Sequence, residues 1–252
     1  MFYKKLNYPN ADIMKAMIFA AGLGTRLKPF TDKHPKALAI VNNKTLLQRN
    51  IEYLQQFGIN EVIVNVHHFA AQIIEAITLN NGWGSNITIS DETSEVLETG
   101  GGLKKAAWYF EQEKNFVLMN VDMLTNFNLL KLIQYHQQQT NTLATLAVTS
   151  RNSSRCFLCN NQNVLCGWRN KLTQEQKIVR PSETLIEKAF SGIHVIDTSI
   201  FSLIQQSGKF SMVDVYLSLA NNNNIQCYDH TGSTLLDVGK PENIILAEQL
   251  FA

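Results

Sequence analysis

Short apolar runs alternate with amphipathic stretches through the first 150 residues. The runs predict strands at residues 16–20, 61–66, 87–90, 116–120 and 142–149. Apolar residues spaced three and four positions apart predict helices at residues 46–57, 70–79, 102–110 and 129–138. Strands that alternate with helices are typical of a mostly parallel sheet with helices on both faces. We therefore expect an α/β fold of the Rossmann-like type, a three-layer sandwich around a mostly parallel mixed sheet.

The pattern becomes richer in strands after residue 150. Residues 156–168 predict a hairpin, and residues 170–181 are a polar excursion. A further strand is predicted at 190–196, followed by a helix at 212–219. We expect this part of the chain to add strands to the same sheet and to form a β-rich lid over one side of a ligand site.

Charge is nearly balanced along the chain, with 22 basic and 21 acidic residues among 252. A protein of this kind has no overall positive field suited to a nucleic-acid polymer. The sequence has no apolar run near the roughly 20 residues that cross a bilayer, and it does not begin with a secretory signal. Four unevenly placed cysteines do not form a disulfide or zinc pattern. We expect a cytoplasmic protein that binds neither membranes nor nucleic acid.

The stretch from residue 20 to residue 36, AAGLGTRLKPFTDKHPK, directly follows the first predicted strand. Gly22 and Gly24 allow a tight turn whose N–H groups can bind phosphate oxygens. The same stretch carries four cations, Arg26, Lys28, Lys33 and Lys36, against the single anion Asp32. It is neither a P-loop nor a dinucleotide fingerprint, because the lysine and the third glycine of those motifs are missing. The stretch therefore predicts a site for a phosphate-rich ligand.

Two aspartates each follow a short apolar run. Asp122 comes after the strand predicted at 116–120, and Asp237 follows Leu235 and Leu236. An aspartate at a strand end is commonly a turn or N-cap residue. Here, however, Asp122 lies at the sheet edge that carries the phosphate loop, and a triphosphate needs a divalent cation held by one or two carboxylates. The two aspartates could together bind one Mg²⁺ ion.

A second glycine cluster, L-E-T-G-G-G, occupies residues 97–102. Three consecutive glycines carry an entropic cost on folding, so they indicate a specific need for close backbone approach. We interpret the cluster as a loop that lies against a flat ligand such as a base, with Thr99 capping the following helix. The alternative is a flexible connector.

The string G-x-G-T-R-L-x-P-x-T-x-x-x-P-K at residues 22–36 resembles the signature of the sugar-phosphate nucleotidyltransferases. These enzymes couple a nucleoside triphosphate to a sugar 1-phosphate. The resemblance runs from about Met14 to the end of the chain, with further anchors at residues 97–102, 120–122, 190–193 and 236–239. The motif L-E-T-G-G-G resembles the corresponding sequence of uridylyltransferases that act on N-acetylmuramate 1-phosphate. It also resembles that of relatives described as mannose-1-phosphate guanylyltransferases.

The resemblance implies roles for individual residues. Arg26 and Lys36 would be catalytic, and Asp122 and Asp237 would hold Mg²⁺. The nucleotide would be bound by Arg26 and Lys36 together with Ala21, Gly22, Gly24, Thr25, Thr99, Gly100 and Asn120. The expected partners are a nucleoside triphosphate and a sugar 1-phosphate.

The resemblance also implies how the chain is divided. We expect one nucleotidyltransferase domain over residues 14–252, preceded by an N-terminal extension at residues 1–13. Within the domain, residues 14–150 would bind the nucleotide and residues 151–252 the sugar. The chain stops soon after Asp237 and carries no hexapeptide-repeat domain of the kind found in bifunctional relatives, so we expect no acetyltransferase activity.

The chain departs from the family pattern on the sugar side. Many members carry E-K-P about ten residues before the glycine equivalent to Gly192, and its lysine binds the sugar phosphate. Here Glu187-Lys188 is followed by alanine and stands only four residues before Gly192. We therefore do not transfer the role to Lys188. Arg155, with Ser191 and Gly192, is our candidate for the sugar-phosphate site.

We expect UTP as donor and N-acetylmuramate 1-phosphate as acceptor. The alternatives are GTP with mannose 1-phosphate, and UTP or dTTP with glucose 1-phosphate. A nucleotide-sensing subunit without turnover is an alternative from another class. Such a subunit should lack a phosphate-loop cation or a metal-binding aspartate. This chain has both cations and both aspartates, namely Arg26, Lys36, Asp122 and Asp237.

Overall fold

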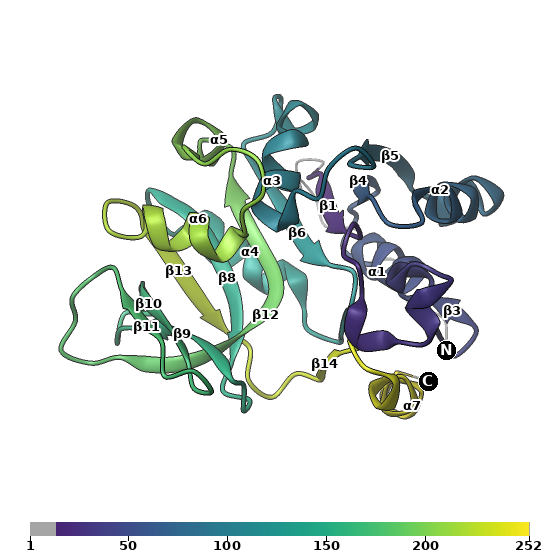
Figure 1. Cartoon of the computed structure of the whole chain (residues 1–252). Helices are drawn as coiled ribbons and strands as arrows, with labels where there is room; N and C mark the ends of the chain where they lie inside the picture. Colours follow the sequence, from purple (N-terminus) through teal and green to yellow (C-terminus); the bar gives the residue numbers. More distant parts are fainter. Residues whose placement is uncertain (1–13, 252) are drawn as a thin grey trace.

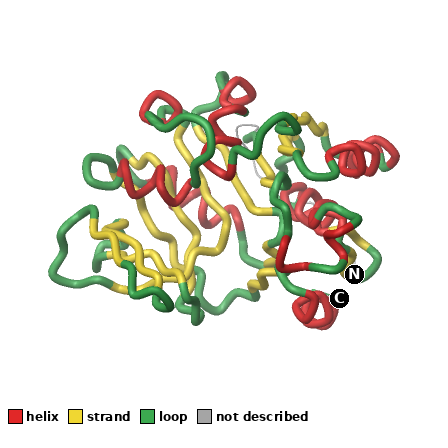
Figure 2. Tube along the Cα trace, in the orientation of Figure 1, coloured by secondary structure: helices red, strands yellow, loops and turns green. Residues whose placement is uncertain are grey.

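The computed structural model describes residues 14–251, and the extension predicted at residues 1–13 lies outside them. Ten strands form one mixed sheet in the described part of the chain (Figures 1 and 2). In spatial order, eight of them are β11 (Gln176–Ile178), β10 (Leu165–Asn170), β9 (Arg155–Cys159), β12 (Ile186–Asp197), β6 (Asn115–Asn120), β1 (Ala16–Phe19), β4 (Glu61–Val66) and β5 (Asn86–Asp91). The other two are β8 (Thr142–Thr149), which pairs with β12, and β13 (Asn224–Asp229), which pairs with β8.

The strands β6, β1, β4 and β5 run parallel, as expected for apolar runs that are buried on both faces. The register places Phe19, at the end of β1, opposite Asn65 of β4 and Asn120 of β6. The carboxyl ends of these strands therefore meet at one edge of the sheet, which is where ligands bind in open sheets of this kind.

Helices cover both faces of the sheet. One face packs against α1 (Leu46–Gln55), α2 (Ala70–Leu79) and α4 (Leu129–Gln138), and α7 (Pro241–Leu250) contributes Ala247 to the same hydrophobic core. The other face packs against α3 (Glu98–Lys105), α5 (Ile200–Leu203) and α6 (Met212–Leu219). Alternate residues of β1 point to the two sides, with Ile18 in the first core and Met17 in the second. The predicted three-layer α/β sandwich is thus confirmed.

The strands after residue 150 extend the same sheet. The predicted hairpin forms β9 and β10, and β12 crosses from β9 to the central strands β8 and β6. The stretch predicted to be a polar excursion contains one more strand, β11, which pairs with β10. The hydrophobic pattern does not predict this strand, because all three of its residues are exposed at the edge of the sheet and the segment is mostly polar. The lid and the boundary near residue 150 stay predictions.

The glycine cluster lies inside a helix and not in a loop, so this prediction was wrong. Helix α3 begins at Glu98, and a short 3-10 helix, Ala107–Phe110, follows it. A Cβ atom at Gly100 would lie 2.4 Å from the ring of Phe210, and one at Gly101 would lie 2.3 Å from the carbonyl oxygen of Gly208. The glycines therefore let the segment before α6 pack directly on α3.

Thr99 does not cap its own helix, contrary to the sequence prediction. Its Oγ1 atom accepts a hydrogen bond of 2.9 Å from the N–H of Met212, at the first turn of α6. The N–H of Gly100 donates instead to the carbonyl oxygen of Phe210, at 2.9 Å. An N–H group in the first turn of α3 thus finds its hydrogen-bond acceptor in the backbone of a segment far away in the sequence.

Two small ladders complete the described structure. Strand β14 (Leu235–Asp237) pairs with β7 (Met123–Thr125), and β2 (Ile40–Val41) pairs with β3 (Lys44–Thr45). The first ladder brings the C-terminal part of the chain beside the segment that follows β6 (Figure 1). Between residues 14 and 251, no helix has both the length and the apolar character that crossing a bilayer requires.

Candidate active site

A cleft opens at the carboxyl edge of the parallel strands. It consists of two neighbouring hollows of about 420 and 270 Å³. Both are lined by Phe19, Gly22, Gly24, Thr25 and Thr99. The larger hollow also includes Ala21, and the smaller one also includes Arg26, Lys36, Asn120 and Asp122. The phosphate-loop residues proposed from the sequence thus lie together around one space.

The loop after β1 folds back on itself at Gly24. This residue has a φ of 62°, in the left-handed region, and its carbonyl oxygen accepts hydrogen bonds from Leu27 N–H at 2.8 Å and from Thr31 Oγ1 at 3.0 Å. A Cβ atom at this position would lie 2.9 Å from the Cβ of Lys36. The glycine therefore allows Lys36 to pack against the beginning of the loop.

The first residues of the loop are held by Asn65, which the sequence analysis missed. Its Oδ1 atom accepts hydrogen bonds from the N–H groups of Ala20 at 2.7 Å and Ala21 at 3.3 Å. Its Nδ2 atom donates to Glu92 Oε1 at 2.8 Å. Both side chains are almost completely buried. The available signal was a polar residue that interrupts the apolar run 62–66 of β4, close to its carboxyl end.

Glu92 and His67 form one wall of the larger hollow, next to Asn65. Burial raises the pKa of the Glu92 carboxyl above its ordinary value, against the lowering effect of the hydrogen bond from Asn65. His67 Nδ1 lies 2.7 Å from the carbonyl oxygen of Glu92, and because a carbonyl only accepts, Nδ1 carries the proton. The ring nitrogen Nε2 of His67 is then a hydrogen-bond acceptor in the neutral ring.

Each of the two predicted metal-binding aspartates forms an ion pair with a cation of the loop. Lys36 Nζ contacts Asp122 Oδ2, and these side chains are only 11% and 18% exposed. Arg26 Nη2 lies 3.5 Å from Asp237 Oδ2, in a pair that is 58% and 34% exposed. The first pair is therefore more strongly shielded from water than the second.

The ladder between β7 and β14 brings the two aspartates together. Asp237 is paired with Met123, the residue after Asp122, and the N–H of Val238 donates to the carbonyl oxygen of Asp122 at 2.8 Å. A Cβ atom at Gly239 would lie 2.6 Å from Asp237 Oδ1 and 2.7 Å from Arg26 Nη2. Glycine at position 239 thus leaves space around the carboxylate.

These residues fit a divalent cation. Asp237 Oδ1 is buried and has no hydrogen-bond partner within residues 14–251, which is an unusual state for a carboxylate oxygen. A hard cation such as Mg²⁺ prefers oxygen ligands and commonly takes one or two carboxylates together with phosphate oxygens and water. The described residues contain no group of three or more His, Cys, Asp or Glu suited to a metal ion. Substrate and water would therefore have to complete the coordination.

The residues proposed for the sugar phosphate are only partly brought together. Gly192 has a φ of 70°, and a Cβ there would lie 2.9 Å from Asn120 Nδ2, so this glycine lies against the cleft. Ser191 is fully buried, and its Oγ atom is 2.7 Å from His230 Nε2. Burial lowers the pKa of His230 to about 4, so the ring is neutral near pH 7. Ser191 is therefore not exposed at the cleft surface, and a contact of this residue with a sugar phosphate stays a prediction.

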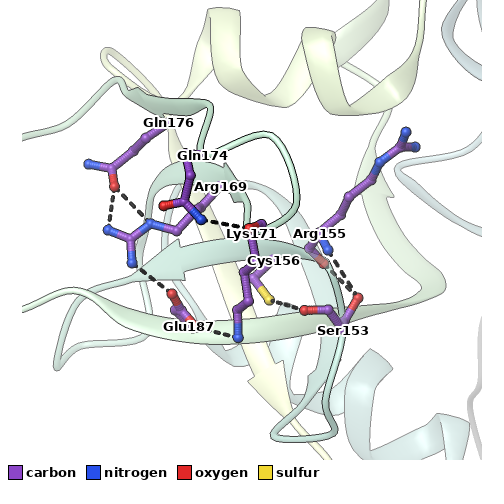
Figure 3. Close-up of polar contacts among 8 residues, drawn as sticks. All are labelled: Ser153, Arg155, Cys156, Arg169, Lys171, Gln174, Gln176 and Glu187. Atoms are coloured by element: carbon purple, nitrogen blue, oxygen red, sulfur yellow. Dashed lines mark hydrogen bonds and ion pairs between the residues drawn. The ribbon is translucent and has the colours of Figure 1, made fainter.

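Arg155 is exposed at the start of β9, and Figure 3 shows its side chain pointing away from Lys171. Nearby, Glu187 accepts hydrogen bonds from Lys171 and from Arg169, and these bonds hold its pKa below the ordinary value. The cation Lys188 is paired with Asp229 at the same sheet edge as the cleft. A contact of Arg155 with an acceptor phosphate stays a prediction.

A family model described as nucleotidyl transferase matches residues 15–251. The chain belongs to the nucleotidyl transferase family. Among curated relatives, the mannose-1-phosphate guanyltransferase of Yarrowia lipolytica is 25% identical over 240 residues, which cover 94% of this chain and 64% of that protein. The N-acetylmuramate alpha-1-phosphate uridylyltransferase of Caulobacter vibrioides is 40% identical over 112 residues, which cover 43% of this chain and 46% of that protein. The chain thus spans less than two thirds of the length of the fungal relative.

Solved structures of two nucleotide-bound proteins share the fold of this chain. HddC from Yersinia pseudotuberculosis, complexed with GMP-PN, has a TM-score of 0.77 and 22% identity, and the match covers 95% of this chain and 100% of that one. A UTP-bound UGPase from Acinetobacter baumannii has a TM-score of 0.76 and 16% identity, with 95% and 93% coverage. At these identities the likeness establishes the fold.

Proposed function

We propose that the protein transfers a nucleotidyl group from a nucleoside triphosphate to a sugar 1-phosphate, releasing pyrophosphate. The observation that carries the proposal is the meeting of two cations and two carboxylates, Lys36 with Asp122 and Arg26 with Asp237, beside the phosphate loop. Membership of the nucleotidyl transferase family supports the same reaction class. A regulatory subunit without turnover is disfavoured, because all four residues are present and lie together.

In this reaction an oxygen of the sugar phosphate attacks the α-phosphorus in line, and pyrophosphate leaves from the opposite side. The attacking phosphate is already ionised near neutral pH, so no general base is needed. The protein contributes position and charge, as in phosphoryl transfer generally. Arg26 and Lys36 would neutralise the triphosphate and the departing pyrophosphate. Asp122 and Asp237 would hold Mg²⁺, whose charge would stabilise the phosphates during transfer.

The two substrates are part of the same proposal. UTP with N-acetylmuramate 1-phosphate is favoured by the L-E-T-G-G-G segment and by the 40% identity with the Caulobacter uridylyltransferase. GTP with mannose 1-phosphate is the second candidate, supported by the match with the fungal guanyltransferase over 94% of this chain. Glu92 on the cleft wall also suits GTP, because carboxyl oxygens accept hydrogen bonds and guanine offers more N–H donors than uracil.

We expect faster pyrophosphate release with UTP and N-acetylmuramate 1-phosphate than with any other pair. Initial rates should be compared for UTP, GTP, CTP and dTTP, each with N-acetylmuramate, mannose and glucose 1-phosphates. A clear preference for GTP with mannose 1-phosphate would contradict the uridylyl assignment and leave the reaction class intact. Absence of pyrophosphate release with every pair would contradict the proposed function as a whole.

Asn65 offers a test of how the phosphate loop is positioned. Replacing it with leucine removes the acceptor of Ala20 and Ala21 N–H and the donor to Glu92, while preserving most of the volume. Each buried group left unsatisfied costs about 1–3 kcal/mol, so the melting temperature should fall. Because the loop also loses its anchor, we expect kcat/KM for the triphosphate to fall about tenfold or more.

The matched control for Asn65 is Asn170→Leu. Asn170 is also buried and accepts a backbone N–H, from Leu172, but it lies on β10 toward the other end of the sheet. This variant should lose stability and keep its kinetic constants. An Asn65→Leu protein that melts earlier yet binds and uses the triphosphate normally would limit Asn65 to a structural role.

A further inference from the structure

The two carboxylates proposed to hold a metal already have counter-ions within the protein. Lys36 neutralises Asp122, and Arg26 neutralises Asp237. These same cations are the groups proposed to bind the triphosphate. Each of the four side chains is therefore already paired with an opposite charge, and the formal charges of the four sum to zero.

We propose that Lys36 is an exchangeable counter-ion whose release from Asp122 couples the binding of a divalent cation to that of the triphosphate. This inference rests on the proposed function, since it concerns the same site. In the free protein the ammonium of Lys36 competes with a metal ion for Asp122. When the triphosphate is present, its oxygens form ion pairs with Lys36 and Arg26. The carboxylates of Asp122 and Asp237 are then available to bind the metal ion.

The charges of the four side chains predict that a divalent cation or a triphosphate binds weakly in the absence of the other. A divalent cation that binds alone must displace an ammonium group from a carboxylate, and the displaced charge stays nearby in a region with little water. Lys36 is only 11% exposed, so solvent compensates poorly for the lost partner. When both ligands bind, each broken ion pair is replaced by a new one. By linkage, the metal must strengthen triphosphate binding by the same factor as the triphosphate strengthens metal binding.

The geometry permits the exchange without movement of the fold. Lys36, Arg26, Asp122 and Gly239 all line the smaller hollow, so the old and new partners share one space. Gly24 lies beneath the stem of Lys36, where an added Cβ would come within 3.6 Å of its Cδ atom. Added side chains at Gly24 and Gly239 would crowd Lys36 and Arg26, so glycine at both positions leaves these cations space beside the hollow.

Burial distinguishes the two ion pairs. The Arg26–Asp237 pair spans 3.5 Å and is more than half exposed on the arginine side, so solvent and salt screen it. The Lys36–Asp122 pair is shielded on both sides. Most of the competition with a metal ion in the free protein should therefore come from Lys36.

The test measures Mn²⁺ binding to the full chain by electron paramagnetic resonance, without any turnover. Wild type, Lys36→Met and Lys28→Met are titrated with Mn²⁺ alone. Lys28 is the matched control because it lies in the same loop, is paired with Asp32 and makes no ion pair with Asp122 or Asp237 within residues 14–251. We expect Lys36→Met to bind free Mn²⁺ about tenfold more tightly than wild type, within the usual range of coupling between sites. Lys28→Met should stay within about twofold of wild type.

The titration is repeated with saturating non-hydrolysable UTP and GTP analogues. At least one analogue should tighten Mn²⁺ binding to the wild type by about tenfold or more, and by much less in Lys36→Met. If Lys36→Met is poorly folded by circular dichroism, Lys36→Gln replaces it, since glutamine keeps a donor for Asp122 without the charge.

The two arms separate this inference from the proposed function. Unchanged or weaker Mn²⁺ binding in the folded Lys36 variants would overturn the exchange, even if the wild type produces pyrophosphate normally. Failure of both analogues to tighten Mn²⁺ binding to an active wild type would overturn it as well. A failure of the proposed function would be seen in a different measurement, as the absence of pyrophosphate release by the wild type.

Discussion

Replacing either Asp122 or Asp237 with asparagine is expected to reduce turnover by about 10³-fold or more while leaving the fold intact. The two carboxylates are the proposed metal ligands, and a bound metal supplies several kcal/mol of charge stabilisation in the transition state, at about 1.4 kcal/mol per tenfold in rate. Pyrophosphate release measures the loss, and circular dichroism with thermal melting checks the fold. In the wild type, a chelator should abolish activity, and Mg²⁺ or Mn²⁺ should restore it.

Asp32 provides the control for these substitutions. It lies in the phosphate loop, is paired with Lys28 and is about half exposed, so Asp32→Asn should retain nearly normal turnover. Near-normal activity of Asp237→Asn would remove that residue from the site. Activity that persists in full after chelation would contradict the metal requirement itself.

The second large effect is expected for Arg26→Ala, with a fall in kcat/KM of at least about 10²-fold. Arg26 presents a fork of N–H donors at the smaller hollow and approaches Asp237 from the 3-10 helix Thr25–Leu27. Loss of one charge-assisted contact in a preorganised site costs about 2.7–4 kcal/mol of transition-state stabilisation. Steady-state kinetics with the preferred substrate pair measure the change.

Lys28 and Lys33 are the controls for Arg26. They lie in the same loop, but neither lines the two hollows of the cleft. Their alanine variants should lose little activity. Similar losses at Arg26, Lys28, Lys33 and Lys36 would mean that the loop acts only as a diffuse positive field.

Much of the fold followed from local patterns. The strands β4 and β8 and the helices α2, α4 and α6 have the ends that hydrophobic periodicity predicts. The two strands are mostly apolar and the three helices are amphipathic, so their own residues determine their type. Strand β11 was missed because it is short and polar, and it forms only through pairing with β10.

The site was predicted where sequence neighbours determine it. The loop from residue 20 to 36 and Asp122 follow parallel strands, so the topology alone brings them to one edge. That Asp237 joins them depends on the ladder between β14 and β7, and only the family resemblance indicated it.

The interactions that were missed all join residues far apart in the sequence. Asn65 binds Ala20 across 45 positions, and Ser191 is hydrogen-bonded to His230 across 39. The role of Gly100 depends on the ring of Phe210, which no local pattern around residues 97–102 reveals. Sequence spacing can predict which residues share a sheet edge, but not which side chain satisfies a buried polar group there.

The most direct test of the proposed reaction follows the oxygen atoms. A sugar 1-phosphate labelled with ¹⁸O in its phosphate group is incubated with the protein, Mg²⁺ and the preferred nucleoside triphosphate, and the products are analysed by mass spectrometry. The proposed attack on the α-phosphorus predicts that all of the label is retained in the nucleotide sugar and that pyrophosphate carries none. Label in the pyrophosphate, or consumption of the triphosphate without a nucleotide sugar, would contradict the proposed reaction.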